Sequence, residues 1–183
     1  DTQVVDEPLY AHYLMVTGVE HPGYEEVLAS QDQDGARVVR QMRGDWEKPI
    51  VFFKHIAKHV IALPIDFLLE GQVLFLIREP DQMLSSLINQ LPEPTLQETA
   101  LKEQWELAQW LQSQGRSPLV VDSRQILLEP QATLTRLCEA LEIPFEPGML
   151  SWEPGPRPED GIWAPHWCHN VRQSTGFGTY KRK

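Results

Sequence analysis

The sequence predicts an α/β fold, a three-layer arrangement in which helices cover both faces of a mainly parallel sheet. Four short apolar runs are typical of strands, and the segments between them carry apolar residues at helical spacing. The runs are residues 3–5, 50–53, 73–77 and 119–121. A charged residue closely follows each run: Glu7, Lys54, Arg78 and Asp122. Because ligands bind outside the carboxyl ends of strands in open α/β sheets, these positions predict where a functional site lies.

Length and composition predict one domain over residues 1–183. The chain has 42% hydrophobic and 23% charged residues, which is ordinary for a globular protein that can bury a core. Its net charge of −10 disfavours a nucleic-acid surface, because such a surface depends on clustered positive charge. An anionic small ligand would need a local group of cations that overcomes this charge.

Targeting signals and cysteine usage predict a cytoplasmic protein. No apolar run approaches the roughly 18 residues of a membrane span, and acidic residues open the chain in place of a signal peptide. Cys138 and Cys168 lie far apart and form no CxxC pair, so neither a disulfide framework nor a metal site is expected. We therefore expect no membrane or nucleic-acid partner, and the sequence makes no prediction of oligomeric state.

The segments between the strands predict helices, a loop and a C-terminal wall. Residues 24–43 are expected to be helical, with these inward positions: Val27, Leu28, Val38, Val39 and Met42. An amphipathic helix that stops near Gly115 is predicted by this stripe: Leu101, Trp105, Ala108 and Leu111. Another helix begins at Pro130, and residues 89–95 form a loop. Residues 144–177 are rich in proline and tryptophan and predict an ordered lid or wall.

The stretch Val73–Ser86 predicts an anion site. Five apolar residues indicate a strand buried on both faces, and Pro80 stands at the first position of a following helix. That helix should pack on the sheet through these residues: Met83, Leu84, Leu87 and Ile88. Arg78 lies between strand and helix, where α/β proteins bind anions. The alternative is that Arg78 only pairs with Glu79 or another acid.

The same stretch, FLIREPDQMLSS, resembles the strand–helix signature of sulfotransferases that use 3′-phosphoadenosine-5′-phosphosulfate (PAPS). In that family R-x-P is followed by a serine eight residues after the arginine, as in Arg78, Pro80 and Ser86. The resemblance implies that Arg78 and Ser86 hold the 3′-phosphate of PAPS. Helical geometry alone does not choose between Ser86 and Ser85, which are equally displaced from the apolar face.

Further segments are similar to a bacterial-type, sulfotransferase-like branch of the family. They are DEPLYAHYL at the start, residues 120–145, MLSWEPGP, and STGF at residues 174–177. The resemblance implies a P-loop-NTPase-like sulfotransferase fold. The family's first strand ends in a loop that cradles the phosphosulfate, yet the first strand–helix unit here has no glycine- or serine-rich loop, and no GxxxxGK[ST] occurs. We therefore expect the first strand and loop to be missing from this sequence.

Candidate catalytic residues follow the second apolar run. Sulfuryl transfer needs charge stabilisation and a base for the acceptor hydroxyl. Lys54 is the candidate for stabilising the charge, and the alternative is a solvated lysine at a strand end. His59 is preferred as the base over His55, because it would lie one helical turn beyond the strand end. Either could instead be an ordinary surface histidine.

Other candidate site residues could contact the acceptor or the nucleotide. Glu7 could orient a loop or a substrate amine, or simply form a turn before Pro8. Three tryptophans could line an acceptor pocket, stack on adenine, or only pack: Trp152, Trp163 and Trp167. Three residues could donate to a phosphate or form a simple turn: Ser174, Thr175 and Gly176.

The leading hypothesis is a PAPS-dependent sulfotransferase that acts on a hydroxyl or amine of a small-molecule acceptor without a metal. One alternative is a catalytically silent nucleotide-binding or interaction module that keeps the 3′-phosphate site. The other is a relative of P-loop nucleotide kinases, which the absence of a Walker loop disfavours.

Overall fold

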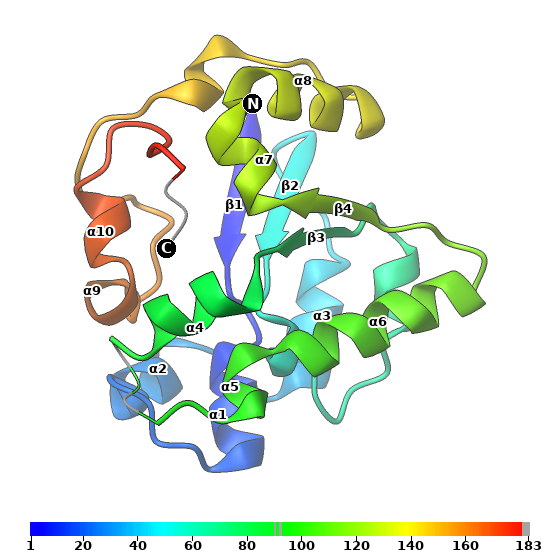
Figure 1. Cartoon of the computed structure of the whole chain (residues 1–183). Coiled ribbons are helices and arrows are strands. Elements are labelled where there is room, and N and C mark those ends of the chain that lie inside the picture. The colour runs from blue at the N-terminus through cyan, green and yellow to red at the C-terminus, as the bar shows by residue number, and fades with distance from the viewer. Residues whose placement is uncertain (90, 92, 181–183) are drawn as a thin grey trace.

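The computed structural model describes residues 1–89, 91 and 93–180 (Figure 1). Its strands are β1 (Thr2–Asp6), β2 (Ile50–Lys54), β3 (Leu74–Ile77) and β4 (Leu119–Asp122). β1 pairs with β2 and β3 pairs with β4, both in parallel. The predicted α/β class with parallel strands is therefore confirmed. Within the described residues the strands form two separate two-stranded sheets, where the sequence had predicted one.

Helices connect and surround these strands. They are α1 (Tyr10–Thr17), α2 (Tyr24–Ser30), α3 (Gly35–Met42), η1 (Ala57–His59), η2 (Asp66–Leu69), α4 (Pro80–Leu87), α5 (Leu96–Thr99), α6 (Leu101–Ser113), α7 (Ser123–Leu128), α8 (Pro130–Ala140), η3 (Pro147–Leu150), α9 (Ala164–Trp167) and α10 (His169–Arg172). In Figure 1 the carboxyl ends of β1 and β2 point toward α1 and α5, whereas α8 lies near the N-terminus at the other end. None of the helices in the described part of the chain is long and apolar enough to span a membrane.

The core is built around α1. Tyr10, Tyr13 and Leu14 are buried in one cluster with Val27 and Trp163. A second cluster contains these residues: Leu9, Val38, Val39 and Phe67. The predicted inward valines are thus buried as expected.

The predicted helical region at residues 24–43 forms two helices, α2 and α3. Asp34 is the N-cap of α3, and its side chain accepts a hydrogen bond of 3.1 Å from the Arg37 N–H. A capping side chain of this kind starts a new helix.

Three apolar stretches are more exposed than their patterns predict. Leu76 and Ile77 of β3 are 55% and 41% exposed, so β3 is not buried on both faces. In the described residues β3 pairs with β4 alone, which leaves its other edge open. α4 has no buried residue, and Trp105 of α6 is 66% exposed although Leu111 on the same helix is buried.

The C-terminal segment 144–177 packs against the body of the protein. Trp163 lies edge-on to Tyr10 in the core, with ring centroids 5.3 Å apart. Arg172 donates two hydrogen bonds of 3.0 and 2.8 Å to Asp160. A bridge between Ser151 and Gly176 joins the two ends of the segment. These contacts are those of a wall that is tied to the core and to itself.

Candidate functional site

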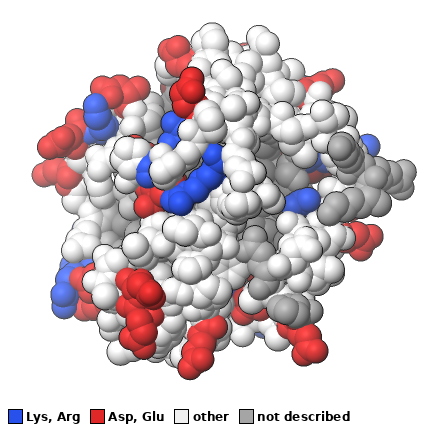
Figure 2. All heavy atoms as spheres, turned by 90° about the vertical axis from the view of Figure 1, so that its left-hand side faces the viewer, with Lys and Arg blue, Asp and Glu red and all other residues white. Residues whose placement is uncertain are grey.

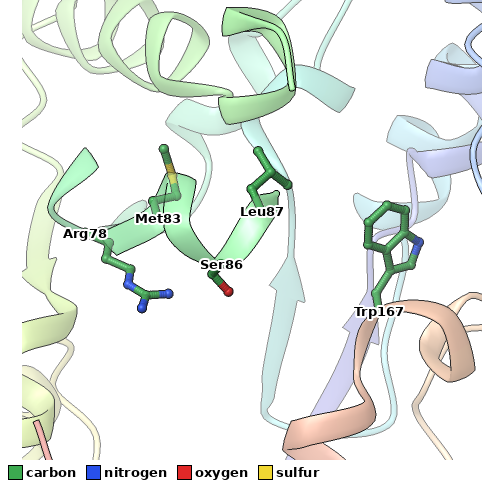
Figure 3. Close-up of a pocket in the computed structure, with 5 residues that line it drawn as sticks. All are labelled: Arg78, Met83, Ser86, Leu87 and Trp167. Carbon is green, nitrogen blue, oxygen red and sulfur yellow. The ribbon is translucent and has the colours of Figure 1, made fainter. Parts of the chain in front are cut away.

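A cavity of about 200 Å³ lies beside the carboxyl end of β3. Its lining consists of Arg78, Met83, Ser86, Leu87 and Trp167 (Figure 3). Arg78 comes directly after β3 and two residues before Pro80, the first residue of α4. Trp167, the last residue of α9, lies across the cavity from α4. The structure therefore brings together an arginine, a serine and a tryptophan from the predicted set.

The helical geometry of α4 determines which of its side chains face the cavity. Met83 and Leu87 are four residues apart and extend to the same side of the helix in Figure 3. In Figure 3, Arg78 and Ser86 extend to the same side of α4, and Trp167 stands opposite them. The cavity thus has polar groups at one wall and an indole at the other.

The two neighbouring serines of α4 have different environments. The Ser85 hydroxyl donates a hydrogen bond of 2.6 Å to the carbonyl of Asp81, one turn earlier in the same helix. Ser86 lies at the cavity instead. Of the two serines that helical spacing left open, Ser86 is thus the one that lines the cavity.

Arg78 is exposed at the cavity wall. Among the residues that the structure describes, its guanidinium has no ion pair with Glu79 or with any other carboxylate. A cation without a protein partner next to a cavity is a suitable binding group for an anion.

Lys54 lies at the carboxyl end of the other sheet and is held by two carboxylates. Its ammonium contacts Glu7 and lies 2.9 Å from Asp6 Oδ1. The Glu7 N–H also donates a hydrogen bond of 2.8 Å to the Lys54 carbonyl. Burial disfavours the charged form of Lys54, but the attraction of Glu7 and Asp6 outweighs burial and raises its pKa. Glu7 is thus engaged by Lys54.

The two candidate bases, His55 and His59, are held in the neutral form by burial. His59 is 2% exposed and stacks on Tyr10 with ring centroids 4.7 Å apart. Burial, reinforced by nearby cations, lowers its pKa well below the usual value. Burial also lowers the pKa of His55 to about 4, and both of its ring nitrogens are buried. Both rings are therefore neutral at pH 7, although the lowered pKa makes each a weak base, and His59 lies deeper, beneath Tyr10 and Tyr13.

Acidification is expected to destabilise the protein through its buried histidines. The pKa values of His21, His55 and His59 are all lowered in the folded chain, chiefly by burial. Because a histidine in the unfolded chain titrates near pH 6.5, the unfolded state binds more protons below that pH. Stability therefore decreases as the pH falls from about 6.5 toward 4. Calorimetry should show a Tm that drops between pH 7.5 and 5.

A comparison of two histidine variants isolates the contribution of a buried histidine to the pH dependence of Tm. His55→Gln should reduce the pH dependence of Tm, because it removes one buried titrating ring. His169→Gln is the matched control, since His169 is exposed and should leave the profile unchanged. Identical profiles for the two variants would contradict the expectation.

A buried polar network that the sequence did not predict adjoins these histidines. Lys58 and Glu98 form an ion pair of 2.7 Å, and both side chains are less than 15% exposed. Glu98 also lies 3.5 Å from His21 Nε2, and the His21 ring is hydrogen-bonded to the Tyr10 hydroxyl at 2.8 Å. The network joins α5 and η1 to α1. Nothing in the local sequence marks a lysine and a glutamate forty residues apart as a buried pair.

The remaining predicted residues lie in the C-terminal wall, outside the lining of the cavity. Trp152 donates a hydrogen bond of 2.9 Å from Nε1 to Ser174 Oγ, and its N–H donates to the Thr175 carbonyl. The Ser174 hydroxyl in turn donates to the Val171 carbonyl at 2.6 Å. These groups hold the two ends of the wall together, with Gly176 at the bridge. Trp163 is buried in the core, so Trp167 is the predicted tryptophan that lines the cavity.

Acidic side chains dominate the rim of the face that carries α9 and α10, and basic side chains gather in small groups (Figure 2).

Both cysteines are free thiols. In the described part of the chain no group of three or more His, Cys, Asp and Glu side chains could hold a metal ion.

Comparisons with known proteins agree with the fold. A family model described as "Sulfotransferase domain" matches residues 1–181. Branched-chain-amino-acid aminotransferase-like protein 1 of Arabidopsis thaliana is 40% identical over 184 residues, which is 100% of this chain and 33% of that protein. Aminotransferase-like protein 2 of the same plant is also 40% identical, over 98% of this chain and 32% of its own length. The chain thus spans about a third of the curated relatives it matches.

Among solved structures, a sulfotransferase domain from the curacin biosynthetic pathway is similar to this chain. The two are 16% identical with a TM-score of 0.43, and the match covers 92% of this chain and 64% of that one.

Proposed function

The chain belongs to the sulfotransferase domain family, and from this premise we propose that it transfers a sulfuryl group from PAPS to a hydroxyl or amine of a small-molecule acceptor. The observation that carries the proposal is the cavity lined by Arg78, Ser86 and Trp167. A guanidinium and a hydroxyl suit a phosphate, and an indole face suits a purine ring. Adenosine 3′,5′-bisphosphate, the product that PAPS leaves behind, carries both groups.

Lys54 is the proposed residue for the charge that develops on the sulfuryl oxygens. Its ammonium has three N–H donors: it donates one to Glu7, and Asp6 Oδ1 lies 2.9 Å away as an ion-pair partner. We infer that a remaining donor is directed at an oxygen of the ligand. The raised pKa of Lys54 keeps it charged at neutral pH, as electrostatic stabilisation requires.

His55 is the proposed base, in preference to His59. It directly follows Lys54 and is the less buried of the two rings. In the proposed reaction the acceptor oxygen or nitrogen attacks sulfur, the S–O bond to the nucleotide phosphate breaks, and the base takes the acceptor's proton. The nucleotide leaves as adenosine 3′,5′-bisphosphate, so atoms and charge balance without a metal.

Binding and transfer are tested in turn. Calorimetry with adenosine 3′,5′-bisphosphate should give saturable binding, and binding of adenosine 5′-monophosphate should be weaker because it lacks the 3′-phosphate. Transfer of labelled sulfate from PAPS to a library of hydroxyl and amine acceptors then tests the enzyme. No binding of the bisphosphate to the wild-type chain would contradict the proposal.

A binder without transferase activity is the second candidate. It is favoured by one observation, that the first strand–helix unit of the given sequence has no glycine- or serine-rich loop to cradle the phosphosulfate. This candidate predicts binding of the bisphosphate together with no labelled product from any acceptor.

The two serines of α4 supply a matched pair of variants. Ser86→Ala should weaken binding of adenosine 3′,5′-bisphosphate by roughly 3- to 10-fold, the usual effect of one lost hydrogen bond. Ser85→Ala should leave binding unchanged, because the Ser85 hydroxyl is already used by Asp81. Both affinities are measured by calorimetry. A larger loss from Ser85→Ala than from Ser86→Ala would reverse the assignment.

A further inference from the structure

A second arginine, Arg124, lies at the same sheet edge as Arg78. In the parallel pairing of β3 with β4, Ile77 stands opposite Asp122 at the carboxyl ends of the two strands. Neighbouring strands are about 4.8 Å apart. Arg78 follows its strand end by one residue and Arg124 follows by two. Figure 1 shows α4 and α7 leaving these adjacent strand ends in different directions. The register therefore places two cations at one edge.

The C-terminal tail links Arg124 to the helix behind Arg78. The Arg124 guanidinium lies over the ring of Tyr180, 5.3 Å from its centroid. The Tyr180 hydroxyl accepts a hydrogen bond of 2.9 Å from Gln82 Nε2. Gln82 belongs to the first turn of α4, four residues after Arg78. A cation–π contact and a hydrogen bond thus hold Arg124 toward the α4 side of the edge.

The guanidiniums of the two arginines at this edge are not paired with carboxylates. Within residues 1–89, 91 and 93–180, neither Arg78 nor Arg124 forms an ion pair. The carboxylate nearest to Arg124 in the chain, Asp122, caps α7 and accepts the Arg124 backbone N–H at 2.8 Å, so this bond uses the backbone and not the guanidinium. In a chain of net charge −10, this edge therefore offers two guanidiniums whose N–H donors are not taken by a carboxylate.

We propose that Arg124 is a second phosphate-binding residue, which binds the 3′-phosphate of the nucleotide together with Arg78. This inference rests on the proposed function and adds a residue to its site. A phosphate dianion can accept paired hydrogen bonds from two guanidiniums, whereas a monoanion would leave one of them poorly matched. Tyr180 positions Arg124 through its ring and is not itself a ligand.

The test measures discrimination between two nucleotides. Arg124→Ala should weaken binding of adenosine 3′,5′-bisphosphate by roughly 10- to 100-fold, as expected for loss of a charged hydrogen-bond donor. Its affinity for adenosine 5′-monophosphate should stay the same, because that ligand has no 3′-phosphate. A merely structural role would change both affinities alike. Arg124→Lys should retain part of the discrimination, since it keeps the charge without the planar fork.

Three further variants complete the test. Tyr180→Phe keeps the ring beneath Arg124 and should change binding less than Tyr180→Ala. Arg136→Ala is the matched control, because this exposed arginine of α8 is remote from the cavity lining. If the wild-type chain binds the bisphosphate and Arg124→Ala binds it equally well, the inference is overturned while the proposed function stands. If the wild-type chain binds neither nucleotide, both are overturned.

Discussion

Replacement of Arg78 by alanine is expected to weaken binding of adenosine 3′,5′-bisphosphate about 100-fold. A charge-assisted hydrogen bond contributes roughly 1.5–3 kcal/mol, and a guanidinium can make two to one phosphate. Arg78 has no partner among the described residues that would compensate for the loss or compete with a ligand. Calorimetry at fixed salt concentration measures the effect, because exposed charges are screened by ions.

Controls separate loss of the phosphate contact from loss of structure. Arg78→Ala should keep the wild-type Tm, because Arg78 is exposed and lies outside both core clusters. Arg78→Lys should recover only part of the affinity, since an ammonium cannot bind a phosphate in the same forked geometry. Binding of adenosine 3′,5′-bisphosphate by Arg78→Ala at wild-type affinity would refute the role of Arg78.

Replacement of Glu98 by alanine is expected to lower the free energy of unfolding by about 3–5 kcal/mol. The substitution leaves Lys58, which is 8% exposed, without its carboxylate partner at 2.7 Å. Removing one member of a buried ion pair leaves an uncompensated charge in the interior, and that charge accounts for the cost. Urea denaturation of wild-type and variant chains measures the difference.

The double variant Lys58→Met/Glu98→Leu is the decisive control. It removes both charges and keeps side chains of similar size, so most of the lost stability should return. Asp66→Ala is a second control, because it removes an exposed partner of Arg43 and should change stability little. A double variant as unstable as Glu98→Ala would show that packing, and not the unpaired charge, explains the effect.

The sequence-based predictions were correct where they depended on residues that are close together in the chain. Short apolar runs identified all four strands, because a strand of four or five residues has to be apolar locally to be buried. Pro80 marked the start of α4 correctly, since its fixed φ angle and missing N–H suit a first helical position. The resemblance of the Arg78–Ser86 stretch to sulfotransferases was confirmed by the family comparison.

The predictions failed where burial depends on a neighbour that is remote in the sequence. The apolar run of β3 indicated a strand buried on both faces, yet Leu76 and Ile77 are exposed beside an open edge. Trp105 fits the spacing of an inward stripe, but the spacing of apolar residues within one helix does not determine which side of that helix packs against the core. The roles of Trp152 and Trp163 in the wall and core were equally hidden, because composition alone cannot separate packing from binding.

The sequence by itself determined the α/β class, the positions of the strands along the chain and the placement of Arg78 at a strand end beside a serine-bearing helix. Local periodicity and a short motif are enough for these features. Only the tertiary structure decided that Ser86 and Trp167 share a cavity with Arg78, that Lys58 and Glu98 are a buried pair, and that the strand ends before Arg78 and Arg124 are paired. Parallel strand register and long-range packing create these neighbours, because both join residues that no local pattern connects.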